Sequence, residues 1–324
     1  APMMFSIIIP THNSNATLTV ALRSCLNQTF GDFEIIVIDD ASQEPAAKIC
    51  EGLADPRIVC LRNGFNIGAS ASRNRGLEAA RGEYAVFLDA DDVYLPNKLE
   101  VLSRAIANGH PDVLLHRQYR LFKTQEGAAS WSELPTRSLE PGEPIEEFTF
   151  RAGEYYNINV LCVRRRIFEV TRFRPDMRML EDQAFVFDCV RAAKTVAVLD
   201  DLLAVYVDDS RAGRASRRHR TPEDFRAFQD YAQNHLTVRG QALIDATIAS
   251  ELSIFSHPLK VTGALWRGYR AGMAFPRLLF YGFRSLAGAR ISAALLDLAR
   301  NATPASPSPK WMSLLHPSQK AEIS

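Results

Sequence analysis

The sequence is poor in cysteine, nearly balanced in charge and free of long hydrophobic runs. Its 324 residues contain five cysteines, an odd number without a C-x-x-C pair, which argues against a disulfide framework or a zinc ribbon and for reduced thiols in the cytosol. The formal net charge is +1, so overall electrostatics give no case for a nucleic-acid partner. No apolar run is long enough for a membrane-spanning helix. These absences predict a cytoplasmic protein that binds no nucleic acid.

Targeting and low-complexity segments are also scarce. The apolar stretch 3–10 is too short for a signal peptide and has no basic region before it. A Pro/Ser-rich stretch lies at 302–310, and we expect residues 302–324 to form a flexible tail. With 47% hydrophobic residues, the chain can bury a core for one large domain plus an appendage.

One short stretch, 84–92, joins an apolar run to a cluster of acids. Residues 84–88 are apolar and favour β structure, which predicts a buried strand. Three carboxylates follow at once: Asp89, Asp91 and Asp92. Because such charges repel one another and are costly to desolvate alone, we expect a cation beside them. Oxygen ligands in an open site suit Mg²⁺ or Mn²⁺, whereas the alternative is a solvated acidic turn.

Strands and helices alternate before this stretch. Apolar runs predict strands at 5–10, 34–38 and 57–61, and the spacing of apolar residues predicts helices at 16–28, 45–53 and 69–80. Strands that are apolar throughout predict an α/β protein with a mostly parallel sheet, covered by helices on both faces. Ligands of such sheets lie beyond the carboxyl ends of the strands. Three polar clusters fall there: 11–13, 39–42 and 89–92.

The second half of the chain is less regular. We expect a helix at 96–108, strands at 112–116 and 158–163, a helix beginning at 180 and one or two strands within 195–206. Residues 126–144 are rich in Gly, Pro, Ser and Glu and predict a surface excursion, and 211–220 predicts a basic loop. Beyond 221 the chain is predicted to be helical.

Six motifs occur in one order and spacing. They are SIIIPTHN at 6–13, QTF at 28–30, EIIVIDDAS at 34–42, NIGASASRN at 66–74, DAD at 89–91 and ED at 181–182. Together they make the chain resemble the family 2 glycosyltransferases of the GT-A fold, over roughly residues 5–216. The resemblance implies a Rossmann-like, mostly parallel sheet and an inverting enzyme. Such an enzyme moves a sugar from a nucleotide-diphosphate sugar, with UDP-hexose expected, to a hydroxyl of a glycan or lipid-linked acceptor in surface polysaccharide or glycolipid synthesis.

The resemblance also implies roles for particular residues. Nucleotide binding would fall to Pro10, Thr11, His12, Asn13, Asp39, Asp40, Arg73, Asp89 and Ala90, with Arg211 and Arg214 reaching the diphosphate from the basic loop. Asp91, with Asp89, would hold Mn²⁺ or Mg²⁺. Asp182 would be the general base, and Glu181 would contact the acceptor or brace the site. Two departures stand out: His12 replaces a tyrosine common in relatives, and Val207 follows Tyr206 where relatives often carry Arg or His.

Structural interpretations of the same residues remain open. Asn13 could cap the following helix, Asp39 and Asp40 could form a plain turn, and Asp182 could simply favour a helix N-terminus. Arg73 could be an exposed helix charge. We expect a catalytic domain over 1–220, with a nucleotide half at 1–116 and an acceptor half at 117–220, followed by a helical region at 221–301.

The C-terminal third is basic and aromatic. No acidic residue occurs between 252 and 296, and Arg270, Arg277 and Arg284 recur at heptad spacing, which predicts one helix face, with a kink at Pro276. Basic residues beside aromatics favour a helix at a membrane interface, here a peripheral inner-membrane contact through 260–290. The alternative is a helical subdomain that packs on the catalytic domain.

Two other functions compete with glycosyl transfer. Asp89 and Asp91 fit the nucleophile motif of a haloacid-dehalogenase-like phosphatase, but that fold carries the motif on its first strand, whereas three predicted strands precede it here. A non-catalytic sugar-nucleotide-binding protein is the second alternative, for which Asp182 would be dispensable.

Overall fold

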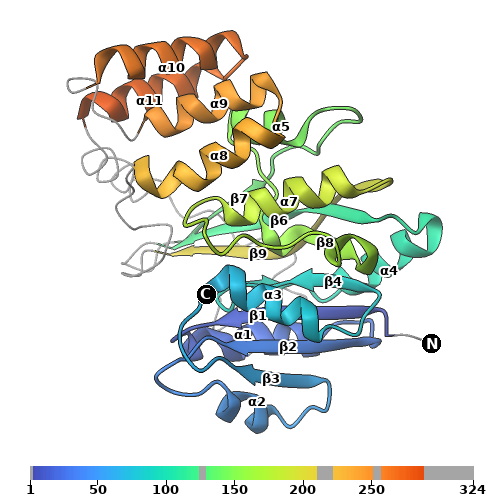
Figure 1. Cartoon of the computed structure of the whole chain (residues 1–324). Helices are drawn as coiled ribbons and strands as arrows, with labels where there is room; N and C mark the ends of the chain where they lie inside the picture. Colours follow the sequence, from blue (N-terminus) through green and yellow to red (C-terminus); the bar gives the residue numbers. More distant parts are fainter. Residues whose placement is uncertain (1–2, 124–128, 210–221, 251–256, 288–324) are drawn as a thin grey trace.

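One mixed sheet organises the protein. The computed structural model describes residues 3–123, 129–209, 222–250 and 257–287, and within these ranges the sheet has the order β3-β2-β1-β4-β8-β6-β9-β5, with β7 paired to β6. Figure 1 shows β1–β3 at one end of the molecule and α8–α11 stacked at the other. The predicted α/β class and the helical C-terminal region are confirmed.

The strands are β1 Phe5–Thr11, β2 Phe33–Asp39, β3 Ile58–Arg62, β4 Tyr84–Phe87, β5 Val93–Tyr94, β6 Val113–Lys123, β7 Ala129–Leu134, β8 Leu161–Arg164 and β9 Val196–Asp209. The α-helices are α1 Asn15–Leu26, α2 Ala47–Leu53, α3 Ala69–Ala79, α4 Lys98–Gly109, α5 Ile145–Ala152, α6 Arg165–Phe168, α7 Glu181–Ala192, α8 Arg226–His235, α9 Val238–Ala249, α10 Pro258–Arg270 and α11 Phe275–Ala287.

The N-terminal half is parallel, as its apolar runs predict. β1 pairs in parallel with β2 and β4, and β2 with β3. Alternate side chains of β1 enter two cores: Ile8 packs in the cluster that contains α3 and α7, and Ile7 in the cluster that contains α1 and α4. Gly76 of α3 makes the first packing possible, because a Cβ there would lie 2.5 Å from a methyl carbon of Ile8. The close approach of α3 brings Arg73 to the sheet edge.

The second half of the sheet departs from a parallel arrangement. β8 runs antiparallel to both β4 and β6, and β6 pairs in parallel with β9. Two predictions were wrong here. The excursion predicted at 126–144 contains β7, which pairs antiparallel with an extended β6, and the strand predicted from 158 begins with a 3₁₀ turn at Ile158–Val160. Pairing with β6, the strand before it in the chain, rather than local composition makes β7 a strand.

The C-terminal helices pack on α7 and the sheet. Phe228 of α8 and Leu243 of α9 are fully buried and share one core with Ile8 of the sheet and Phe185 of α7. The amide of Ala274, just before α11, donates to the carbonyl of Arg151 at the end of α5 (2.9 Å). Within the described ranges, no helix combines the length and apolarity that crossing a membrane requires.

The single basic helix predicted around Pro276 is two helices. α10 ends at Arg270, and Gly272 has the left-handed conformation (φ 88°) that commonly follows a helix end. α11 then begins at Phe275 with Pro276 in its first turn, where a missing N–H costs no hydrogen bond. Arg270 therefore lies on a different helix from Arg277 and Arg284, and Pro276 kinks neither.

A buried lysine lies behind the acidic end of β4. The Lys98 ammonium donates to the carbonyl oxygen of Asn159 (2.5 Å) and lies 3.6 Å from the ring centroid of Tyr94, with no solvent exposure. Burial lowers the pKa of Lys98 to about 7. The side chain of Asn159 accepts from the Asp89 amide (3.0 Å) and donates to Asp92 (2.5 Å). This network holds the turn after β4 in place.

All five cysteines are free, as predicted.

Candidate functional site

A cleft of about 1360 Å³ lies beyond the carboxyl ends of β1, β2 and β4. Residues predicted for the site line it from both sides: Pro10, Thr11, His12, Asn13, Asp40, Arg73, Asp89, Ala90, Asp91, Glu181 and Asp182. Asp39 is not in its lining. Arg211 and Arg214 lie outside the described residues, as does the predicted tail at 302–324. The fold thus brings together residues that are far apart in sequence, as the parallel sheet predicts.

The loop after β1 offers polar atoms to the cleft. Thr11 is buried, and its hydroxyl has no hydrogen-bond partner among the described residues. His12 has Nδ1 2.6 Å from the Asp40 carbonyl oxygen, which makes Nδ1 the protonated nitrogen. Asn13, at φ 52°, does not cap α1: its Oδ1 accepts from the Gln43 amide (2.8 Å) and its own amide donates to Ser42 (3.0 Å). These bonds tie the loops after β1 and β2 together.

The adjacent acids after β2 have different surroundings. Asp39 is buried and accepts from the Ser42 amide (2.9 Å), the Ala46 amide (3.1 Å) and Arg62 (2.5 Å). Burial alone would raise the pKa of Asp39, but these donors outweigh it and hold that pKa below its ordinary value. Asp39 thus shapes the loop.

Asp40 instead lines the cleft. Its carboxylate accepts from the Ile67 and Gly68 amides and from Asn63, each at 2.8 Å. The two amides open α3, so Asp40 fixes the start of the helix that carries Arg73. A carboxylate has about four acceptor positions, and three donors leave it capacity for a ligand.

Arg73 is a buried cation and not an exposed helix charge. It is 5% exposed, donates through Nη2 to Asp89 Oδ1 (2.7 Å) and lies 5.4 Å from the ring centroid of Phe173. Its Nε and Nη1 have no hydrogen-bond partner in the part of the chain that the structure describes. Burial opposes the charge, but the carboxylates of Asp89, Glu181 and Asp182 outweigh burial and raise the pKa of Arg73. Unsatisfied buried guanidinium donors are suited to an anionic ligand.

The three acids after β4 diverge. Asp92 turns inward and accepts from Asn159 and from the Val207 amide (2.7 Å), whereas Asp89 and Asp91 line the cleft. Among the described residues, no group of three or more His, Cys, Asp or Glu side chains forms a complete metal site. Asp91, with the oxygen of Asp89 that Arg73 does not take, fits Mg²⁺ or Mn²⁺, since such ions take one or two carboxylates and complete their coordination with water and substrate phosphates.

Glu181 and Asp182 open α7 on the other side of the cleft. Leu180 before them has a left-handed backbone (φ 61°), and Asp182 Oδ1 accepts from the Gln183 amide (2.8 Å). Burial, and then the charge of Asp182, raise the pKa of Glu181 to about 7. Burial also raises the pKa of Asp182, against the opposing charge of Arg73. A buried carboxylate with a raised pKa is suited to general-base chemistry.

Sequence reasoning missed several residues of the cleft. Tyr155 and Asn157 follow α5 and line it, and α11 contributes Arg277, Tyr281 and Arg284. The heptad spacing of the two arginines was visible in the sequence. That this face of α11 lines the cleft depends on packing against α5 and α9, for which the sequence carries no local signal.

Comparisons with known proteins agree with this architecture. Residues 6–173 match the family model described as Glycosyl transferase family 2. An uncharacterized glycosyltransferase of Haemophilus influenzae is 34% identical over 193 residues, which cover 59% of this chain and 73% of that protein. A UDP-Glc:alpha-D-GlcNAc-diphosphoundecaprenol beta-1,3-glucosyltransferase of Escherichia coli, WfaP, is 38% identical over 96 residues, which cover 30% of this chain and 38% of WfaP.

Solved structures share the fold. The S. aureus TarS 1-349 complex with UDP-GlcNAc has a TM-score of 0.62 at 22% identity, covering 92% of each chain. The mannosyltransferase PcManGT from Pyrobaculum calidifontis, in complex with GDP-Man and Mn²⁺, has a TM-score of 0.52 at 16% identity, covering 100% of this chain and 87% of that one. Since the family model covers more than half of the chain, the protein belongs to glycosyl transferase family 2, the family that its motifs resemble.

Proposed function

We propose that this glycosyltransferase inverts the anomeric centre and takes its sugar from UDP-hexose with the help of a divalent cation. The observation that carries the proposal is the arrangement of charge in the cleft. Arg73, Asp89 and Asp91 gather at the ends of α3 and β4, and the Glu181–Asp182 pair stands at the start of α7. One group of charges serves the leaving diphosphate and the other the incoming hydroxyl.

The nucleoside is proposed to bind between the loops after β1 and β2. Asp40 offers a carboxylate to a base N–H or a ribose hydroxyl, and the Thr11 hydroxyl offers a polar atom that no group within the described ranges satisfies. His12 presents an aromatic ring that can stack on the base. Asp39 contributes indirectly, through the loop that it holds.

The diphosphate is proposed to lie between Arg73 and Asp91. Asp91, with Asp89, would hold Mn²⁺ or Mg²⁺ against its oxygens, and the cation when bound neutralises charge that develops on the leaving group. Arg73 adds a fixed positive charge on the protein side, and its ion pair keeps one oxygen of Asp89 occupied. The fold likeness to a transferase solved with GDP-Man and Mn²⁺ supports this placement.

Asp182 is proposed to take the acceptor proton. As the acceptor oxygen bonds to the anomeric carbon, the bond from that carbon to the diphosphate oxygen breaks with its electron pair, and the hydroxyl proton passes to Asp182. Glu181 lies beside it, and two adjacent buried carboxylates resist full ionisation. The pair therefore has a higher affinity for a proton than a single solvated carboxylate has. A non-catalytic binder would have no use for such a pair.

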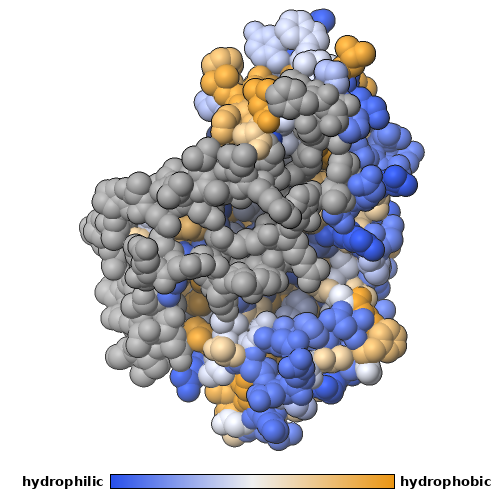
Figure 2. All heavy atoms as spheres, turned by 90° about the vertical axis from the view of Figure 1, so that its left-hand side faces the viewer, coloured by the Kyte–Doolittle hydropathy of each residue, from blue (hydrophilic) through white to orange (hydrophobic). Residues whose placement is uncertain are grey.

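The acceptor is proposed to be a glycan or a lipid-linked saccharide reached at the membrane surface. Exposed apolar side chains gather on α10 and α11: Leu259 (87% exposed), Trp266 (60%), Phe275 (65%) and Leu279 (59%). Figure 2 shows hydrophobic side chains gathered at the top of the molecule, the end formed by these helices. Lys260 and Arg270 are exposed on α10, so this end combines apolar contact with positive charge.

Replacing Asp182 tests the catalytic assignment. Asp182→Asn should lower kcat about 10²- to 10⁴-fold, the usual contribution of a positioned base, and leave UDP affinity unchanged. UDP release from UDP-hexose and thermal shifts with UDP measure the two quantities. Asp176→Asn, at an exposed position nearby, is the matched control and should behave as wild type. A kcat for Asp182→Asn within tenfold of wild type contradicts the assignment.

Removing the metal tests the donor site. UDP with Mn²⁺ should raise the melting temperature of the protein more than UDP with a chelator, since a ligand that binds only the folded state stabilises it. Asp91→Asn should remove this difference, and Asp91→Glu, which keeps a carboxylate, should restore part of it. A wild-type UDP shift that is the same with chelator and with Mn²⁺ would argue against a metal at Asp91.

Co-sedimentation with liposomes tests the membrane contact. Wild-type protein should sediment with vesicles rich in anionic lipid at low salt. The double substitution Trp266→Ser with Phe275→Ser should lower the sedimented fraction several-fold. Val170→Ser, which removes an equally exposed apolar side chain after α6, should have no effect. If wild-type protein stays in the supernatant, the proposed membrane contact is wrong.

A further inference from the structure

One face of α11 forms a wall of the cleft. Arg277, Tyr281 and Arg284 recur at intervals of four and three residues and line the same space as Glu181 and Asp182. The exposed apolar side chains of α11, Phe275, Leu279, Phe283 and Leu286, occupy other positions of the helix. The helix therefore has two distinct surfaces, and its arginines belong to the cleft rather than to the exposed apolar surface.

Arg277 is held in a defined position. Its Nε donates to the Tyr281 hydroxyl (2.7 Å), and its guanidinium carbon lies 5.3 Å from the centroid of that ring. The Tyr281 hydroxyl in turn donates to Thr247 of α9 (3.3 Å). On the other side the guanidinium lies against Gly153, which has φ +79° and where a Cβ would be only 2.1 Å from Arg277 Nη1. Because glycine has no side chain, residue 153 leaves space for the guanidinium group.

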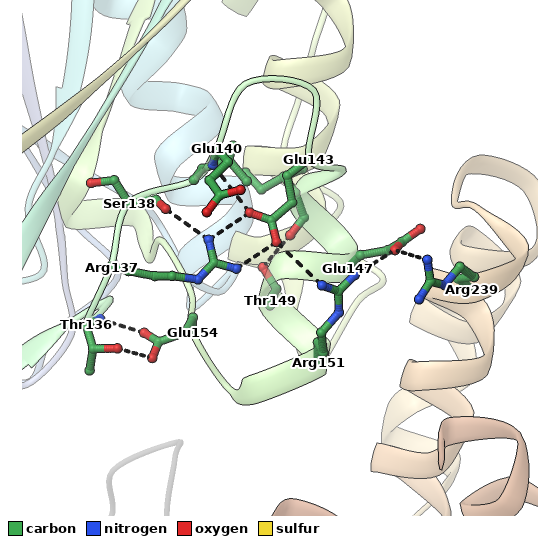
Figure 3. A network of polar contacts seen from close by, with 12 residues as sticks. Thr136, Arg137, Ser138, Glu140, Glu143, Glu147, Thr149, Arg151, Glu154 and Arg239 are labelled. Atoms are coloured by element: carbon green, nitrogen blue, oxygen red, sulfur yellow. Dashed lines mark hydrogen bonds and ion pairs between the residues drawn. The ribbon is translucent and has the colours of Figure 1, made fainter. Parts of the chain in front are cut away.

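Within the described ranges, Arg277 differs from the arginines around it in having no acidic partner. Figure 3 shows nearby arginines that are paired with glutamates: Arg137 with Glu143 (2.7 Å), Arg151 with Glu147 (3.1 Å) and Arg239 with Glu147 (3.7 Å). Among the described residues, no carboxylate lies within ion-pair distance of Arg277. A half-buried guanidinium without a counter-charge costs free energy that a bound anion offsets.

The position of Arg277 indicates which substrate brings that anion. The charges assigned to the donor diphosphate lie on α3 and β4, whereas α11 belongs to the helical stack at the end of the molecule away from β1–β3 (Figure 1). Arg284, on the same face, adds a second guanidinium to the wall. Arginine recognises phosphate through paired, charge-assisted hydrogen bonds.

We propose that Arg277, positioned by Tyr281 and Gly153 and assisted by Arg284, binds a phosphate of the acceptor. The acceptor class is then a saccharide or polyol that carries a phosphodiester or diphosphate near the hydroxyl that is glycosylated. This inference rests on the proposed transferase function, because it assumes that UDP fills the donor end of the cleft.

Calorimetric titration of butyl diphosphate into protein saturated with UDP and Mn²⁺ tests the inference. UDP blocks the donor site, so the probe reports the second anion site alone. Wild type should bind it, Arg277→Met should weaken binding about 10- to 100-fold, and Arg277→Lys should lie between them. Arg270→Met, at an exposed arginine of α10, should bind as wild type, and neutral butyl glucoside should show no dependence on Arg277.

Several outcomes overturn the inference. The inference is wrong if wild-type protein does not bind butyl diphosphate, or if Arg277→Met binds it as wild type does. It is also wrong if Arg277→Met loses affinity for UDP, because Arg277 would then belong to the donor site. If Arg277→Met still binds butyl diphosphate but no longer binds anionic vesicles, Arg277 contacts lipid headgroups instead. UDP affinity of the wild type, titrated first, reports on the proposed function separately. Arg277→Gln serves as a second variant without the charge. Urea unfolding midpoints of all variants equal to that of wild type exclude a folding defect.

Discussion

The buried ion pair between Arg73 and Asp89 is the interaction on which the site depends. Arg73 comes from α3 and Asp89 from the turn after β4, so the pair joins two segments, and Gly76 lets α3 pack closely on β1 beside them. The charge of Arg73 also lowers the cost of ionising Glu181 and Asp182 across the cleft. The buried cation thereby holds acids from two parts of the chain, the turn after β4 and the start of α7, around one space. Without a cation between them, these acids would repel one another.

The C-terminal helices complete the same cleft. α9 packs on α5, and α11 on α9, so residues late in the sequence face the acids of α7. This arrangement gives α11 two surfaces with different chemistry: arginines and Tyr281 on the cleft, and large apolar side chains on the outside. In the proposed reaction an acceptor anchored at a membrane would meet the outer surface first and present its phosphate to the inner one.

Much of the fold could be predicted from local sequence, and part of the site could not. Continuous apolar runs ended by Pro10 or by acids marked β1, β2 and β4, and their alternation with helices brought the polar clusters to one sheet edge. Asp39 and Asp40 are alike in sequence, but Asp39 accepts from the Ser42 and Ala46 amides and from Arg62, whereas Asp40 lines the cleft. The pairing of β7 with β6 and the packing of α11 against α9 are tertiary contacts that composition does not encode, so composition misassigned β7 and did not locate the cleft face of α11.

Glu181, at the start of α7, is predicted to bind its proton near neutral pH. A carbon-detected NMR titration of the glutamate carboxyl groups, assigned with Glu181→Gln, measures this directly. Glu181 should titrate with a pKa of about 7, because burial and the charge of Asp182 favour its protonated form. In Asp182→Asn its pKa should fall. If Glu181 titrates near 4.5, the ordinary value for glutamate, the pair is solvated and the arrangement of charge proposed for this cleft is wrong.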